Sequence, residues 1–264
     1  MYTSFELEAK MKNFKSISGF IVLLSTFTPL SAQWLHYPTP GIPRTPDGKP
    51  NLSAAAPKTA DGKPDLSGIW MGPEDKWFRD LGAAGAKIQM LPWAEALYKQ
   101  RKENKEKGHP SERCIGHGVT DYDTSATLRR FIQTPGIIAI LFEGYNHFRQ
   151  IFLDGRPLPK PTQPSYMGYS VGKWEGDTLV VDTNGLNDQG WLDMEGHPQT
   201  ESTHITERYR RRDFGHIDLQ LIVDDPTAYT NTWSANVRLD YVPDQELIEA
   251  ICENEKDLQH LVGK

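Results

Sequence analysis

The sequence predicts a mainly β fold, in which about eight or nine antiparallel strands run up and down around a barrel. In residues 165–241, short loops containing glycine join apolar segments, as in β-hairpins. Residues 233–241 alternate between apolar and polar side chains, which indicates a strand with one buried face and one solvated face. Closure into a barrel would remove the exposed sheet edges, and a two-sheet β-sandwich is the alternative.

The N-terminus has the pattern of a secretory signal peptide, predicted to comprise residues 1–32. Lysines precede an apolar segment, residues 17–30, and small residues precede Gln33. The apolar segment is shorter than the roughly 20 residues that a membrane-spanning helix needs. We therefore expect a cleaved leader, a periplasmic or secreted protein, and no stable membrane insertion.

Residues 33–67 are rich in proline and glycine and contain an internal repeat. The segment RTPDGKPNLS, which starts at Arg44, recurs from Lys58 as KTADGKPDLS. Each copy places an Asp-Gly turn before a proline that blocks helix formation. This pattern predicts an extended arm ahead of a β-barrel domain, residues 68–264. One hypothesis for the arm is that it binds a protein partner in the cell envelope.

The remaining elements follow in order along the chain. The segment GIWM, residues 68–71, is a short strand where the arm meets the barrel domain. Residues 92–107 predict a helix, because a proline suits its first turn, strong helix formers follow, and a glycine ends it. Further strands are predicted over residues 128–133, 137–142, 148–153 and, as the last strand, 247–252.

The chain has two cysteines, Cys114 and Cys252. An even number of cysteines in an oxidising compartment predicts a disulfide between them, which would link the start of the strands to their end. The formal net charge of -6 lacks the basic excess that nucleic-acid binding requires. We therefore expect no nucleic-acid partner.

Several motifs resemble a family of uncharacterised exported bacterial proteins. They include TADGKPDLSGIW in the arm and SVGKWEGDTLVVDTNG in the hairpin, and the resemblance extends over residues 44–252. It implies export and a β-rich fold, and it supplies no activity. The predicted strand order is also similar to that of lipocalin-like (calycin) barrels.

The favoured hypothesis for function is binding of a small organic molecule at a barrel mouth framed by the long loop of residues 185–199. Aromatic side chains would form the walls, and a few polar groups would orient the ligand. The candidate ligand contacts are Arg149, Tyr169, Trp174, Trp191, Asp193 and Arg208.

The alternative is a hydrolase, lyase or isomerase that needs no cofactor. His204 or His197 would act as general base or acid beside a carboxylate such as Asp182 or Asp193, because imidazole titrates near neutral pH. On the predicted strand, His204 and Glu207 point to opposite faces, so only one of them can face the barrel interior.

A metal site is a third hypothesis, built from side chains that suit zinc: His197, His204, Asp193 and Glu201. Their spacing does not match that of a known zinc motif. We therefore expect neither a metal nor an organic cofactor.

Overall fold

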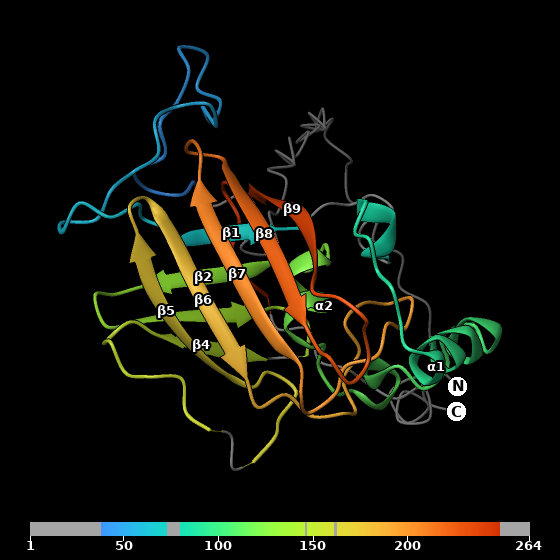
Figure 1. The fold of residues 1–264 in the computed structure, drawn as a ribbon. Helices are drawn as coiled ribbons and strands as arrows, with labels where there is room; N and C mark the ends of the chain where they lie inside the picture. Colours follow the sequence, from blue (N-terminus) through green and yellow to red (C-terminus); the bar gives the residue numbers. More distant parts are fainter. Residues whose placement is uncertain (1–37, 73–79, 146, 161–162, 249–264) are drawn as a thin grey trace, which may run out of the picture. The chain divides into compact units, whose positions relative to one another are not determined.

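The computed structural model describes residues 38–72, 80–145, 147–160 and 163–248 of the chain. Its strands close into one barrel in which each strand lies beside the next one in the sequence (Figure 1). The predicted mainly β barrel is therefore confirmed. Its strands are β1 (Gly68–Met71), β2 (Arg129–Gln133), β3 (Ile137–Phe142), β4 (Phe148–Phe152), β5 (Tyr169–Glu175), β6 (Thr178–Asn184), β7 (His204–Arg211), β8 (His216–Asp224) and β9 (Trp233–Tyr241).

Neighbouring strands of the described barrel are antiparallel at every junction except one. β4 and β5 are parallel, with Ile151 beside Ser170 and Phe152 beside Val171. A parallel pair needs a long connection that returns the chain to the same end of the sheet. The proline-rich residues 153–168 are that connection, so the expectation of an entirely antiparallel barrel is wrong at this junction.

The barrel is closed by β1, which pairs with β9 on one side and with β2 on the other. The predicted strand at residues 68–71 is thus confirmed. The predicted last strand is wrong in its described part, because residues 242–248 contain no strand, and residues 249–252 lie outside the described residues. After β9 the chain turns toward the arm, where the Asp244 carboxylate accepts a hydrogen bond from the Thr39 N–H at 2.8 Å.

Two α-helices are described, α1 (Pro92–Glu103) and α2 (Val119–Thr124), with short 3-10 turns at Gly82–Ala84 and Pro110–Arg113. The predicted helix is confirmed as α1. It ends at Glu103 rather than at residue 107, because Lys105 and Glu106 have left-handed backbones with φ of 55° and 57°. α2 was not predicted, and all of its residues are buried.

The repeated arm sequence folds into a repeated structure. In each copy a threonine N–H donates to a lysine carbonyl at 2.8 Å, Thr45 to Lys49 and Thr59 to Lys63. The glycine of each Asp-Gly turn has a positive φ, of 82° and 80°, which glycine adopts without strain. The two turns are the blue and cyan loops at the end of the strands in Figure 1.

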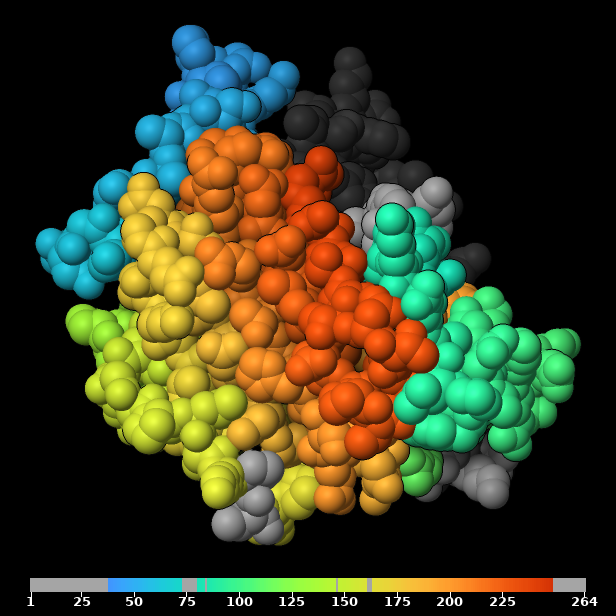
Figure 2. Space-filling view, in the orientation of Figure 1, coloured from blue at the N-terminus to red at the C-terminus, as the bar shows by residue number. Residues whose placement is uncertain are grey.

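The described part of the arm packs on the barrel. Leu66 in the second copy is fully buried, whereas its equivalent in the first copy, Leu52, is partly exposed. The Leu66 N–H donates to Gln133 Oε1 at 2.8 Å, and Trp70 Nε1 donates to the Leu66 carbonyl at 2.9 Å. The space-filling view shows the arm, in blue and cyan, lying against one end of the strands (Figure 2).

The predicted signal peptide, residues 1–32, and Cys252 lie outside the described residues. Leader cleavage and the bridge between Cys114 and Cys252 therefore stay predictions. Within the described ranges, no helix combines the length and the apolar character that crossing a membrane requires.

Candidate functional site

Arg149, a predicted ligand contact, points into the barrel from β4. Its guanidinium binds the Glu207 carboxylate on β7 through two hydrogen bonds, of which Nη1 to Oε1 measures 2.7 Å. It also donates to Ser170 Oγ on β5 at 3.0 Å and to Thr183 Oγ1 on β6 at 2.9 Å. Arg149 is 3% exposed and Glu207 is 0% exposed. The arginine thus connects four strands across the interior, and Glu207, not His204, faces inward.

The same buried network shifts the pKa values of two carboxyl groups, Asp123 and Glu207, in opposite directions. Burial and the neighbouring charge of Glu207 raise the pKa of Asp123, the α2 residue next to it, well above its ordinary value. Burial also favours the protonated form of Glu207, but the charge and hydrogen bonds of Arg149 outweigh this effect and lower the Glu207 pKa. Glu207 therefore stays ionised against Arg149, while Asp123 holds a proton.

One end of the barrel contains a cavity of about 370 Å³, which we call the mouth pocket. Gly172 and Trp174 face it from the inner side of β5, and Leu153 at the end of β4 faces it from the neighbouring strand. Gln133 at the end of β2, residues 134–135 of the β2–β3 turn and residues 59–61 of the second arm turn complete its lining. A Cβ atom at Gly172 would lie 2.7 Å from Leu153 Cδ2, so the glycine keeps this wall open.

The polar groups of the mouth pocket are mostly used by the protein. The Gln133 amide binds the arm through both of its ends, accepting from Leu66 N–H at 2.8 Å and donating to the Pro64 carbonyl at 3.1 Å. Asp61 Oδ1 accepts the Thr59 hydroxyl, and no other described residue bonds the second oxygen of this carboxylate. The pocket therefore offers an apolar, partly aromatic surface with one carboxylate at its edge.

The end of the barrel at α2 lies opposite, because β2 starts beside α2 and ends at the mouth pocket. Here the loop of residues 185–199 packs inward. The Thr120 hydroxyl donates to the Leu192 carbonyl at 2.6 Å, and the Arg101 guanidinium lies 4.2 Å from the centre of the Trp191 ring. Trp191 is 4% exposed. The loop thus covers this end, and the cavity described above lies at the other end.

Two residues predicted from this loop, Asp193 and His197, form a buried pair. His197 Nδ1 lies 2.6 Å from Asp193 Oδ2, which also accepts the Leu81 N–H at 2.9 Å. The His197 ring stacks on Tyr98 of α1, with 4.4 Å between ring centres. Asp193 Oδ1 accepts the backbone N–H groups of residues 196 and 197. The pair therefore fastens the loop to α1, and this role is structural.

The Asp193–His197 pair should make stability depend on pH. Burial alone would lower the His197 pKa, but the charge and hydrogen bond of Asp193, with a contribution from Asp80, raise it above its ordinary value. The unfolded chain has a histidine pKa of about 6.5. The stabilisation is therefore complete below about pH 6.5 and is lost as the pH rises through the folded-state pKa. We expect the difference in unfolding free energy between the wild type and His197→Gln to shrink as the pH rises above about 6.5, measured by urea denaturation. A difference that does not change with pH would contradict this assignment.

The other predicted pair, His204 and Asp182, lies on the outer wall. His204 Nε2 is 3.5 Å from Asp182 Oδ1, and the two side chains are 38% and 33% exposed. Thr206 donates to the same Asp182 oxygen at 2.8 Å. The pairing of β6 with β7 brings these residues together, but on the solvent side of the wall, where β7 starts and β6 ends.

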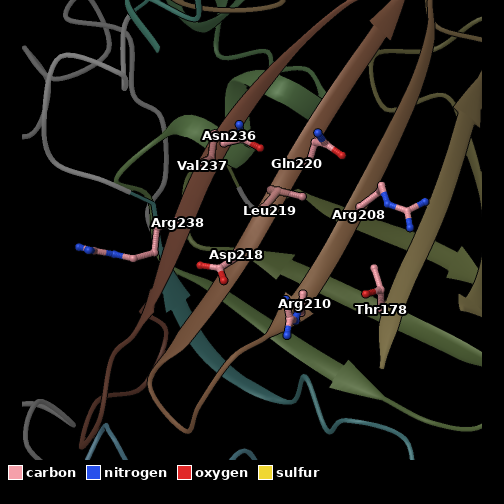
Figure 3. A pocket seen from close by; sticks show the side chains of 9 residues that line it. All are labelled: Thr178, Arg208, Arg210, Asp218, Leu219, Gln220, Asn236, Val237 and Arg238. Carbon is pink, nitrogen blue, oxygen red and sulfur yellow. The ribbon is translucent and has the colours of Figure 1, made fainter. Parts of the chain in front are cut away.

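Arg208 lines a shallow groove of about 540 Å³ on the outer wall across β6 to β9 (Figure 3). Figure 3 shows it with Arg210 and Arg238 around Asp218 and several uncharged side chains. Arg208 donates to Glu175 at 3.1 Å, and Arg238 pairs with Asp240 at 2.7 Å. These pairs neutralise much of the positive charge, which weakens the groove as an anion site. Tyr169 also has a protein partner, since its hydroxyl accepts from Arg156 at 2.9 Å.

Three residues at the α2 end were not predicted, His109, His117 and Asp121. Asp121 Oδ2 lies 2.6 Å from His117 Nδ1 and 3.1 Å from His109 Nε2. Asp121 is 0% exposed, His109 2% and His117 7%. The spacing of four residues between His117 and Asp121 could have predicted their contact from the sequence, because side chains four residues apart lie close together on a helix.

Two groups of described side chains could bring their ligand atoms to one metal ion: His109 with His117 and Asp121, and Asp80 with Asp193 and His197. The metal set considered from the sequence is not assembled, because His204 lies on the outer wall. Hydrogen bonds join the three residues of the first group and the Asp193–His197 pair of the second, and we assign a metal to neither.

Compared with known proteins, the sequence matches no protein-family profile and no curated protein.

Proposed function

We propose that this protein is exported and that its barrel binds a small planar organic amine in the mouth pocket. The observation that supports this function best is the cavity itself, which lies at a barrel end beneath the second arm turn and is lined by inward-facing Trp174. Its volume of about 370 Å³ is within the range typical of small-molecule sites. Export rests on the leader pattern and on the resemblance of residues 44–252 to exported proteins.

The lining favours a planar ring that carries a positive charge. Trp174 is half-buried and lines the pocket, so a ring can stack on it, and an ammonium group nearby is attracted to its face. Leu153 and Pro135 add apolar walls that favour a ring over a sugar or a free anion. The Asp61 carboxylate at the edge supplies the countercharge. The Asp61 oxygen to which no described residue bonds is the acceptor that we assign to the ammonium.

The arm takes part in this proposal as a cover for the pocket. The second arm turn is held to the barrel by Lys58, whose Nζ lies 3.5 Å from Asp177 in the β5–β6 turn. The Gln133 side chain binds the backbone of Pro64 and Leu66, the residues that follow this turn. The packing of the arm on the barrel favours this role over that of a tether for an envelope protein.

Binding of tryptamine, measured by isothermal titration calorimetry on the mature chain, tests this function. We expect tryptamine to bind at least about 10-fold more tightly than indole-3-propionate, which has a similar ring and the opposite charge. Trp174→Ala should weaken tryptamine binding by at least about 10-fold, because the stacking surface is lost. Asp61→Asn should remove most of the preference for the amine.

Asp47→Asn is the matched control. Asp47 occupies the equivalent position in the first arm turn and accepts the Thr45 hydroxyl in the same way, but it does not line the mouth pocket. Binding should be unchanged in this variant. Equal affinity for the two indoles would overturn the amine assignment, and wild-type affinity in Trp174→Ala would overturn the site.

A further inference from the structure

We propose that the α2 end of the barrel is a catalytic site, in which His117 acts as the general base for hydrolysis of small uncharged esters. This site is separate from the mouth pocket and does not depend on ligand binding there. It uses three residues that connect the 3-10 turn at residues 110–113 to α2: His109, His117 and Asp121.

The first argument concerns the protons on the two imidazole rings. The backbone N–H of Ser111 donates to His109 Nδ1 at 3.2 Å, so the proton of neutral His109 is on Nε2. That Nε2–H donates to Asp121 Oδ2 at 3.1 Å. His117 Nδ1, at 2.6 Å from the same oxygen, must likewise carry a proton. Neutral His117 therefore has its lone pair on Nε2.

The second argument concerns access to this lone pair. Among the residues that the structure describes, none forms a hydrogen bond with His117 Nε2. The His117 side chain keeps 8% of its surface exposed, while Asp121 behind it keeps 1%. The rings of Tyr122 and Tyr145 lie beside the imidazole, with centres 5.1 and 5.3 Å away. The imidazole thus packs among aromatic rings, surroundings that suit an uncharged substrate.

The third argument concerns charge. Burial favours protonation of Asp121, but the charge that His117 carries once it is protonated and the hydrogen bonds from both imidazoles outweigh burial and lower the Asp121 pKa. The carboxylate is therefore ionised and stabilises the imidazolium that forms when His117 accepts a proton. Burial and the charge of protonated His117 lower the pKa of His147, which disfavours a second positive charge beside the imidazolium.

The step that this geometry supports is attack by water on an ester. A water proton moves to His117 Nε2 as the water oxygen bonds to the carbonyl carbon. The bond from that carbon to the alkoxide or phenolate then breaks, and the imidazolium returns its proton to the leaving group or to solvent. His117 is the catalytic residue, and Asp121 and His109 are positioning residues that fix its tautomer and orientation.

Hydrolysis of p-nitrophenyl acetate by the mature chain tests the proposal. We expect kcat/KM to fall about 100-fold or more in His117→Gln, because general-base catalysis contributes about that much. Asp121→Asn should lower the rate and shift the pH profile, since an amide cannot stabilise the imidazolium. His216→Gln is the matched control, because His216 Nδ1 also lies 2.6 Å from a carboxylate, that of Asp213, on a more exposed turn.

A second measurement needs no substrate. Nitrogen-15 NMR of the imidazole rings should show His117 with its proton on Nδ1 at neutral pH, and Asp121→Asn should disturb this tautomer while circular dichroism shows a folded barrel. The proposal is overturned if the wild type hydrolyses the ester no faster than His117→Gln. It is also overturned if the His117 proton is found on Nε2.

Discussion

Replacement of Arg149 with methionine should lower the free energy of unfolding by about 3–5 kcal/mol, measured by urea denaturation, because Glu207 would become a buried carboxylate without its cationic partner. The loss should be largest at neutral pH, where Glu207 is ionised in the folded protein. Adding Glu207→Gln to this variant should recover part of the loss, since the uncompensated charge is then removed.

Arg208→Met is the control for this experiment. Arg208 lies on β7, one residue from Glu207, but it points to solvent, where its ion pair with Glu175 at 3.1 Å is screened by water. An exposed pair of this kind contributes less than about 1 kcal/mol. Losses of equal size in Arg149→Met and Arg208→Met would contradict the assignment of the interior pair as the main electrostatic contact of the barrel.

Leu66→Ala should be the second most costly change, with an expected loss of about 2–5 kcal/mol in the free energy of unfolding. Leu66 belongs to the arm, yet it is fully buried, and its removal would leave a cavity between the arm and β1. Urea denaturation of the protein measures the loss.

The sequence repeat supplies the comparison for this variant. Leu52 is the equivalent leucine of the first copy and is only partly buried, so Leu52→Ala should cost clearly less than Leu66→Ala. If both variants unfold like the wild type, the arm is not part of the folded body, and the mouth pocket loses its cover.

The strands from β5 to β9 could be predicted because their side chains alternate and their turns contain glycine. α2 could not, because VTDYDT has few strong helix formers and is stabilised by burial and by bonds such as Thr120 to Leu192. The parallel pairing of β4 with β5 also has no local signal, since it depends on the path of the proline-rich connection.

Some contacts of the candidate sites could also be predicted from the sequence, and others could not. Asp193 and His197 are four residues apart and meet within one loop, so their pairing was predictable. Arg149 and Glu207 are 58 residues apart, and only closure of the barrel brings them together. Trp174 was predicted as a pocket wall, but the mouth that it lines depends on where the arm lies. His109 and His117 meet Asp121 because a 3-10 turn and an unpredicted helix adjoin.

The pairing of the strands divides the closed wall into two sheets. β1 to β4 and β5 to β9 are each paired over longer registers, whereas the junctions β4–β5 and β9–β1 contain two residue pairs each. In Figure 1 the strands β2 and β4 cross the direction of β6 to β8. The mouth pocket straddles one of these seams, between Leu153 and Trp174. A small increase in the distance between β4 and β5 would enlarge the pocket. The hydrogen bond from Arg149 to Glu207 joins one sheet to the other and would limit this opening.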